Sequence, residues 1–174
     1  DGNGYEDLYI GGASGKAARL FLNDGRRFTE KKQSQFEADA EFEDNEALFF
    51  DVDQDGDLDL YVASGIHRER NTEFEIDRLY LNNKGNFSVA NTNLLKNPLN
   101  TGAIAIEDYD ADGDLDVFIG NYSNPKNFGA TVNSTILIND GNGNFTADAN
   151  FVINTRVSDA KWTDVNADGQ KDLL

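Results

Sequence analysis

The sequence predicts an all-β protein, a β-propeller segment of about three four-stranded blades. Three observations lead to this prediction. An aspartate-rich loop recurs along the 174 residues, short apolar runs of strand length flank each copy, and the copies are about 55 residues apart. Periods of this size are typical of propellers and solenoids. The strands after each loop are apolar at nearly every position, so both faces need cover, which the neighbouring blades of a propeller provide.

The repeated loop is clearest at residues 51–59, where the pattern is Asp-x-Asp-x-Asp-Gly-x-x-Asp. We number its positions 1 to 9. Alternate residues of a tightly curled loop can aim their oxygens at one point, and calcium takes roughly six to eight oxygen ligands. Positions 1, 3, 5 and 9 are therefore predicted to bind Ca²⁺ through side chains, and position 7 through its backbone carbonyl. The glycine at position 6 suits a turn that forces a positive φ.

Four copies of the loop are in register, although the chain begins inside the first copy. Their ninth positions, Asp7, Asp59, Asp116 and Asp172, are 52, 57 and 56 residues apart. Three complete calcium sites are expected, with a fourth truncated at the N-terminus, and folding is expected to depend on them. The residues assigned to metal binding are Asp1, Asn3, Tyr5 and Asp7; Asp51, Asp53, Asp55, Asp57 and Asp59; Asp108, Asp110, Asp112, Asp114 and Asp116; and Asp164, Asn166, Asp168, Gln170 and Asp172.

Two other structures share part of this pattern. An EF-hand begins similarly, but it has a glutamate at position 12 and lies between helices. Here position 12 is Ile10, Val62 or Ile119, within β-type runs, which excludes the EF-hand. An Asp/Gly-rich surface turn without metal accounts for one copy far better than for four copies in register.

Each repeat contains the same series of expected strands. The first strand enters the acidic loop, the second leaves it, and a turn rich in Asn, Asp and Gly joins the third to the fourth. Repeats are expected at approximately 1–46, 47–103 and 104–159, with 160–174 incomplete, all in a single domain. Expected first strands are 47–50, 104–106 and 160–162; second strands are 8–10, 58–63 and 115–119; third strands centre on Leu20, Leu79 and Ile136; fourth strands open at Phe28, Phe87 and Phe145.

Residues 29–47 are expected to form a solvated connector with at most one helical turn. Its carboxylates, on Glu41, Glu43, Asp44 and Glu46, are expected to have no basic partner.

Composition limits the classes of function. The chain has no cysteine and no methionine, which leaves out disulfides and thiol chemistry. Its formal net charge of −17 argues against nucleic acid and anionic membranes as partners. No membrane insertion is expected. Because the chain starts inside a loop, the true N-terminus is expected to lie upstream.

These motifs resemble the FG-GAP/VCBS repeat family, the calcium-hairpin propellers related to the head of integrin α subunits. They are most similar to the ASPIC/UnbV-like group of secreted bacterial proteins. The resemblance rests on the Asp-rich hairpins, RLYLNNKGNF, ILINDGNGNF and VSDAKWTDVNADGQKDLL. It implies a seven-bladed extracellular propeller for adhesion or ligand binding. The Phe-Gly and Gly-Ala-Pro signatures of integrin repeats are not evident. Asn166 replaces an aspartate and the first loop lacks its opening residues, so those two sites are expected to be weaker or incomplete.

The expected function is a calcium-stabilised module that is extracellular, on the cell surface or periplasmic. Extracellular calcium modules have Kd values of about 10⁻⁴ to 10⁻³ M, so millimolar calcium would fill such sites. A glycan or protein ligand is expected on the face opposite the calcium hairpins, at two long loops. These are 64–77, with His67, Arg68, Arg70 and Phe74, and 120–135, with Tyr122, Asn127 and Phe128.

Two alternatives stay open: a scaffold propeller of a secreted polysaccharide-degrading enzyme, or a structural spacer. No catalytic residue is assigned, because most clustered carboxylates are committed to metal and catalysis needs an acid/base pair or a nucleophile. Propellers typically have about four to eight blades. The remaining blades of a larger propeller, or another chain, are therefore expected to cover the open ends.

Overall fold

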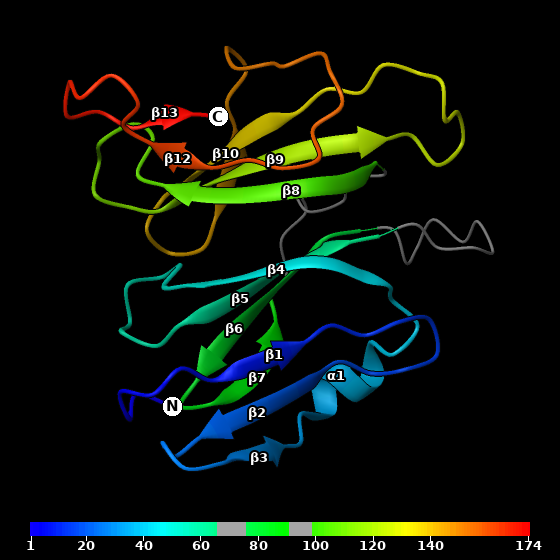
Figure 1. Ribbon diagram of the computed structural model, residues 1–174, viewed down its shortest axis with the longest axis vertical. Helices are drawn as coiled ribbons and strands as arrows, with labels where there is room; N and C mark the ends of the chain where they lie inside the picture. The colour runs from blue at the N-terminus through cyan, green and yellow to red at the C-terminus, as the bar shows by residue number, and fades with distance from the viewer. Residues whose placement is uncertain (66–75, 91–98) are drawn as a thin grey trace.

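The computed structural model describes residues 1–65, 76–90 and 99–174. These residues form four antiparallel sheets stacked face to face, with one short helix (Figure 1). This confirms the prediction of an all-β propeller segment. Sheet 1 contains β1 (Leu8–Ile10), β2 (Arg19–Asn23) and β3 (Phe28–Lys31); sheet 2 contains β4 (Asp44–Phe50), β5 (Asp59–Ser64), β6 (Arg78–Asn83) and β7 (Asn86–Val89); sheet 3 contains β8 (Asn100–Glu107), β9 (Asp116–Ser123), β10 (Thr135–Asn139) and β11 (Phe145–Ala147); sheet 4 contains β12 (Trp162–Thr163) and β13 (Asp172–Leu173).

Strands that are neighbours in the chain are also neighbours in each sheet. The first strands of sheets 2 and 3 are longer than expected, and the first strand of sheet 4 is shorter. In sheets 2, 3 and 4 the ninth loop position pairs with the last residue of the preceding strand: Asp59 with Phe50, Asp116 with Glu107, and Asp172 with Thr163. The acidic hairpins therefore emerge at one end of the stack, at the left of Figure 1, and the connections from second to third strands emerge at the other.

The core lies between the sheets, because the central strands of sheets 2 and 3 are buried on both faces. In β5 the side chains of Leu60 and Val62 pack toward sheet 1, whereas Tyr61 and Ala63 pack toward sheet 3. All four are fully buried. In sheet 3, Phe118 packs toward sheet 4. The unbroken apolar runs thus match strands covered on both sides, as predicted.

The expectation of a solvated connector at residues 29–47 is wrong. This segment contains most of β3, the helix α1 (Ser34–Ala38) and the start of β4. The helix is only about one turn, as expected, but it places Phe36 in the core between sheets 1 and 2, where its ring lies edge-on to Tyr80 with centroids 5.1 Å apart. Gln33, also buried, donates to the Gly85 carbonyl at 2.9 Å and ties the connector to sheet 2.

The expectation that the carboxylates of this segment have no basic partner is also wrong for Asp44. Its carboxylate forms a salt bridge with Arg78, and the two side chains are 4% and 5% exposed. The second carboxylate oxygen accepts from the Tyr9 hydroxyl at 2.7 Å and from the Gly12 N–H at 2.6 Å. The Arg78 guanidinium also lies over the Phe42 ring, 4.1 Å from its centroid. The ion pair joins β4 to β6 within sheet 2, and the contacts of Asp44 with Tyr9 and Gly12 fasten sheet 1 to it.

Candidate metal centre

Three hydrogen bonds recur within the acidic loops and give them one shape. The position 1 carboxylate accepts from the position 6 N–H, the position 5 side chain accepts from the position 7 N–H, and the position 9 carboxylate accepts from the position 2 N–H. Each bond forms in every loop that contains both residues. The donor and acceptor pairs are Gly56–Asp51, Gly113–Asp108 and Gly169–Asp164; Tyr5–Asn3, Asp57–Asp55, Asp114–Asp112 and Gln170–Asp168; and Val52–Asp59, Tyr109–Asp116 and Val165–Asp172.

The glycine at position 6 has a positive φ in every loop, between 85° and 101°, as predicted. Position 4 also has a positive φ, which sequence reasoning missed. It is about 60° at Gln54, Ala111 and Ala167, a conformation that is uncommon for residues other than glycine. The residue type at position 4 does not indicate this conformation, since only the first loop has a glycine there. Two residues with a positive φ therefore curl each hairpin tightly.

Carboxylates converge in two of the loops. One oxygen from each of Asp51, Asp53 and Asp59 lies within 4.8 Å of the others, and Asp108, Asp110 and Asp116 form an equivalent group. We call these groups the acidic triads. Two oxygens bound to one calcium ion at about 2.5 Å are at most about 5 Å apart, so both triads have the spacing that a shared calcium ion requires.

The environment of the first triad also fits a cation. Oδ1 of Asp51 is buried and has no hydrogen-bond partner, an arrangement that is unfavourable for a carboxylate oxygen unless a cation or another donor satisfies it. Burial raises the pKa of the Asp59 carboxyl to about 6, and the charges of Asp53 and Asp55 act in the same direction. Burial likewise raises the pKa of Asp116 in the second triad. A bound divalent cation would reverse this penalty by favouring the charged forms.

The other loop residues assigned to metal binding are placed differently. The Asp57 carboxylate accepts from the Lys84 N–H at 2.8 Å, and that of Asp114 accepts from the Gln54 side chain. Both side chains are therefore engaged outside the triads, which is compatible with a main-chain role for position 7. Asp55 and Asp112 lie outside the triads, and their role as ligands stays a prediction.

The first and last loops do not bring three acidic side chains equally close within the residues that the structure describes. In the last loop the Asn166 amide donates to the Asp168 carboxylate at 3.0 Å, and the N–H of Gly169 lowers the pKa of Asp164. In the first loop Asp1 is the earliest residue present, and the Asn3 side chain donates to it at 3.1 Å. Metal binding by these two loops stays a prediction.

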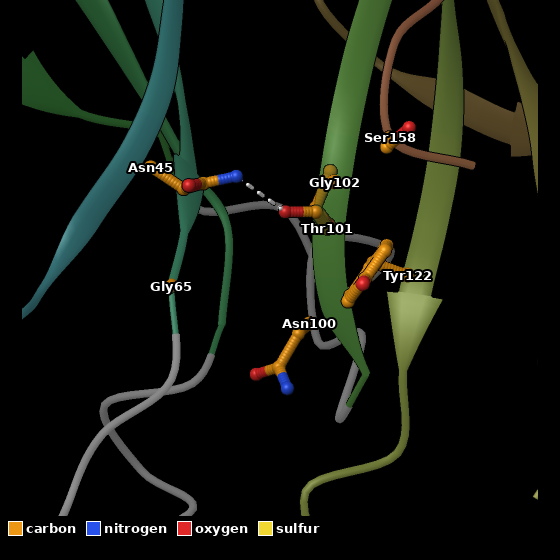
Figure 2. A pocket seen from close by; sticks show the side chains of 7 residues that line it. All are labelled: Asn45, Gly65, Asn100, Thr101, Gly102, Tyr122 and Ser158. Carbon is orange, nitrogen blue, oxygen red and sulfur yellow. Dashed lines mark hydrogen bonds between the residues drawn. The ribbon is translucent and has the colours of Figure 1, made fainter. Parts of the chain in front are cut away.

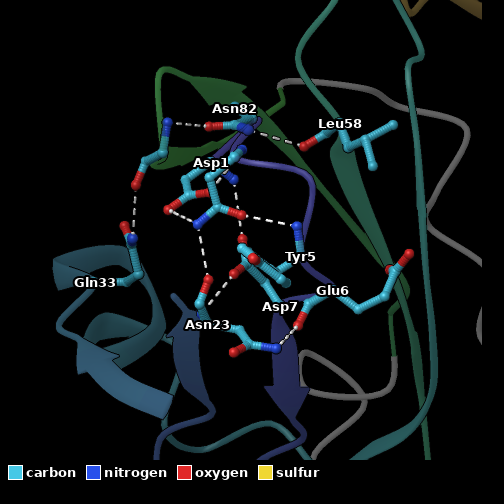
Figure 3. A network of polar contacts seen from close by, with 10 residues as sticks. Asp1, Tyr5, Glu6, Asp7, Asn23, Gln33, Leu58 and Asn82 are labelled. Carbon is cyan, nitrogen blue, oxygen red and sulfur yellow. Dashed lines mark hydrogen bonds and ion pairs between the residues drawn. The ribbon is translucent and has the colours of Figure 1, made fainter. Parts of the chain in front are cut away.

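An asparagine at the end of each third strand holds the acidic loop in place, and sequence reasoning missed its role. We call Asn23, Asn82 and Asn139 the strand-end asparagines. The side-chain amide of each donates to the carbonyl of loop position 8 in the same sheet, at 3.1, 2.9 and 3.2 Å (Figure 3 shows the first two). The side-chain oxygen accepts from a turn glycine, and the backbone N–H donates to the position 9 carboxylate at 2.7 to 2.8 Å.

The strand-end asparagines therefore hold the position 9 carboxylate in place through hydrogen bonds from the neighbouring third strand. Their recurrence at the end of RLFLN, RLYLN and TILIN was the available signal. Asn139 does more, because its amide also donates to the Val52 carbonyl of sheet 2 at 2.8 Å and so links the two loops that carry the acidic triads.

The two long loops that were expected to carry a ligand are only partly described. His67, Arg68, Arg70 and Phe74 lie outside the described residues. In the second loop β9 extends to Ser123, so Tyr122 belongs to the strand rather than to the connection. Phe128 is 55% exposed, and the Arg156 guanidinium lies 5.6 Å from its ring centroid.

Two four-stranded and two smaller antiparallel sheets are stacked face to face, and in sheets 2, 3 and 4 an acidic hairpin joins the first strand to the second. This arrangement defines a β-propeller segment. The sequence matches the FG-GAP-like repeat over residues 1–62, 51–119 and 108–174. The chain therefore belongs to the FG-GAP repeat family. Each match runs from one acidic loop into the next, in agreement with the period found in the sequence. No curated protein matches the chain. The closer similarity to the ASPIC/UnbV-like group stays a prediction.

The helix α1 is too short to cross a membrane.

Proposed function

We propose that the chain is a calcium-stabilised propeller module that works outside the cytoplasm and binds a ligand on the face opposite its acidic hairpins. The observation that carries the calcium part is the acidic triad with the unpaired, buried oxygen of Asp51. In each triad loop, positions 1, 3 and 9 would hold the ion, with position 5 and the carbonyl of position 7 completing the set. The ion would neutralise the clustered carboxylates and keep the hairpin closed.

Isothermal titration of calcium tests this assignment through two substitutions in one loop. Asp51→Asn is expected to weaken calcium binding at its site at least tenfold, because it removes a ligand charge from the triad. Asp57→Asn removes the same charge nearby but keeps the carbonyl, so its expected effect is under threefold. Glu41→Gln, at an exposed residue of the connector, is the control for net charge alone. Equal calcium affinity in the Asp51→Asn and Glu41→Gln variants would rule out the triad as the site.

We also propose that a further blade, or another chain, covers the outer face of sheet 1. Loop positions 10 and 12 point toward the preceding sheet, where they are buried as Leu60 and Val62 in sheet 2. The corresponding Leu8 and Ile10 of sheet 1 are 42% and 46% exposed. Adjacent exposed apolar side chains of this kind are typical of an interaction surface.

Sedimentation measurements examine this second proposal. The isolated 174-residue chain is expected to self-associate at micromolar concentration, because its exposed apolar face has no natural cover. Substituting both Leu8 and Ile10 with lysine is expected to shift the chain to monomer, whereas lysine at Val152, which is 52% exposed outside this face, is not. A wild-type chain that stays monomeric across the concentration range contradicts the proposal.

The face opposite the hairpins supports ligand binding better than a spacer role, because it contains a preformed pocket between sheets 2 and 3. The spacer alternative predicts no saturable ligand at this pocket.

A further inference from the structure

A pocket of about 250 Å³ opens between sheets 2 and 3, at the end of the strands away from the acidic hairpins. Figure 2 shows Asn45 and Gly65 of sheet 2 facing Asn100 and Thr101 at the start of β8. Tyr122 near the end of β9 and Ser158 from the connection to sheet 4 complete the lining. The volume is roughly eight times that of a water molecule in the liquid, which is room for one sugar ring.

The side chains that line the pocket are polar but uncharged. Asn100 is only 4% exposed, and its amide points into the space between the sheets (Figure 2). Its nitrogen donates to the Ser123 hydroxyl at 2.7 Å, but its oxygen is buried without a hydrogen-bond partner. Buried polar atoms are paired in the great majority of cases, so an unpaired amide oxygen in a pocket indicates a ligand that donates a hydrogen bond.

The walls are held in place by hydrogen bonds between lining residues and to buried groups of sheet 2. The Asn45 amide donates to the Thr101 carbonyl at 2.9 Å, and the Thr101 hydroxyl donates to the buried Asp77 carboxylate at 2.8 Å. Asp77 is itself fixed by the Tyr61 hydroxyl and the Ser64 N–H. The start of β8, which presents Asn100, is thus anchored to sheet 2 before any ligand arrives, and a preorganised site loses less entropy on binding.

The connection to sheet 4 is brought over the pocket by a glycine. A side chain at Gly102 would overlap the Val157 carbonyl and the Tyr122 side chain, so only glycine allows this close approach. The Val157 N–H donates to the Asn121 carbonyl at 2.9 Å, which seats Ser158 at the rim. Tyr122 is 39% exposed, and the guanidinium of Arg156 lies 5.9 Å from its ring centroid. An aromatic ring with a polar tip at a pocket rim offers both stacking and hydrogen bonding.

We infer that this pocket binds a neutral sugar unit, with the Asn100 oxygen accepting from a sugar hydroxyl and the Tyr122 ring against the C–H face of the sugar. This inference rests on the proposed ligand-binding role of the face opposite the hairpins. The lining has no charged side chain, since Arg156 lies beside the Tyr122 ring and is not part of it, and the net charge of −17 repels an anion. A ligand with several hydroxyls satisfies both the unpaired acceptor and the amides and hydroxyls of the walls.

The test is a titration of the full chain, in millimolar calcium, with a panel of neutral monosaccharides and glucuronate, followed by saturation-transfer NMR. At least one neutral sugar is expected to bind saturably with a Kd on the order of 1 mM, and glucuronate at least tenfold more weakly than glucose. Ser158→Trp, which fills the pocket from an exposed position, and Asn100→Ala are each expected to weaken sugar binding at least tenfold. Ser88→Trp, on the exposed side of β7, is the matched control and is expected to change nothing.

The same samples separate this inference from the proposed function. The melting temperature with and without calcium reports on the calcium role, and the NMR titration reports on the pocket. Calcium stabilisation without binding of any neutral sugar overturns the inference and leaves the calcium role standing. Sugar binding that survives both Ser158→Trp and Asn100→Ala places the sugar elsewhere and also overturns it. Loss of binding in both variants, with calcium stabilisation retained, supports it.

Discussion

The chain is expected to unfold at a much lower urea concentration in EDTA than in calcium. An ion that binds only the folded state stabilises it by about 2.7 kcal/mol per site at 100 times the Kd. In calcium at 100 times the Kd, the two acidic triads together are therefore expected to contribute about 5 kcal/mol, a large share of the stability of a domain of ordinary size. Fluorescence of Trp162, the single tryptophan, reports on the transition because this residue packs against the core between sheets 3 and 4.

A double variant shows whether the triads are responsible. Asp51→Asn combined with Asp108→Asn is expected to remove most of the difference between the EDTA and calcium curves. Glu41→Gln combined with Asp159→Asn, at two exposed residues outside the loops, changes the net charge equally and is expected to retain the difference. Superimposable unfolding curves with and without calcium for the wild-type chain would falsify the claim that the ions stabilise the fold.

Replacing Arg78 with leucine is expected to lower the free energy of unfolding by about 3 to 5 kcal/mol, because the buried Asp44 carboxylate then loses its counterion. The Tyr9 hydroxyl and the Gly12 N–H would still contact the carboxylate but carry no full positive charge. Urea denaturation at pH 7 in saturating calcium measures this effect.

The exposed pair of Arg19 and Glu30 is the matched control. Its side chains are 52% and 31% exposed, and pairs of this kind contribute about 0 to 1 kcal/mol. Arg19→Leu is therefore expected to change the unfolding free energy by less than 1 kcal/mol. In a double-mutant cycle, Asp44→Asn combined with Arg78→Leu is expected to cost less than the sum of the two single changes. Additive losses would mean that Asp44 and Arg78 contribute no coupling energy to the folded state.

Local patterns predicted the repeated parts of this molecule, because strand, turn and loop chemistry is set by residues close in the chain. The spacing of aspartates and glycine predicted the hairpins, and the apolar runs around Leu60 and Val117 predicted strands covered on both faces. The Arg78–Asp44 pair was not predictable in the same way, since its members are 34 residues apart and no spacing rule connects them. Charge alone suggested a solvated connector, but tertiary packing overrode it at Phe36 and Asp44.

The candidate metal centre was predictable in its residue types but not in its detail. Position 9 was assigned as a ligand, yet the contacts of Asn23, Asn82 and Asn139 that hold it depend on the register of the neighbouring third strand, 16 to 23 residues further along the chain. The interpretation of these asparagines as turn residues was incomplete, because the same side chain accepts from the turn and donates to the loop. The pocket beside Asn100 had no sequence signal, because its lining comes from five separate segments.

Sheets 2 and 3 are joined by side-chain hydrogen bonds at both ends of their strands. Asn139 reaches the Val52 carbonyl beside the acidic hairpins, and Asn45 and Thr101 make the contacts at the pocket end. Two layers joined along one edge can open by rotating about that edge as a hinge. Layers joined along two opposite edges cannot. A tensile load that pulls these blades apart would then meet both rows of bonds at once, and the blades would separate in one abrupt event rather than peel gradually.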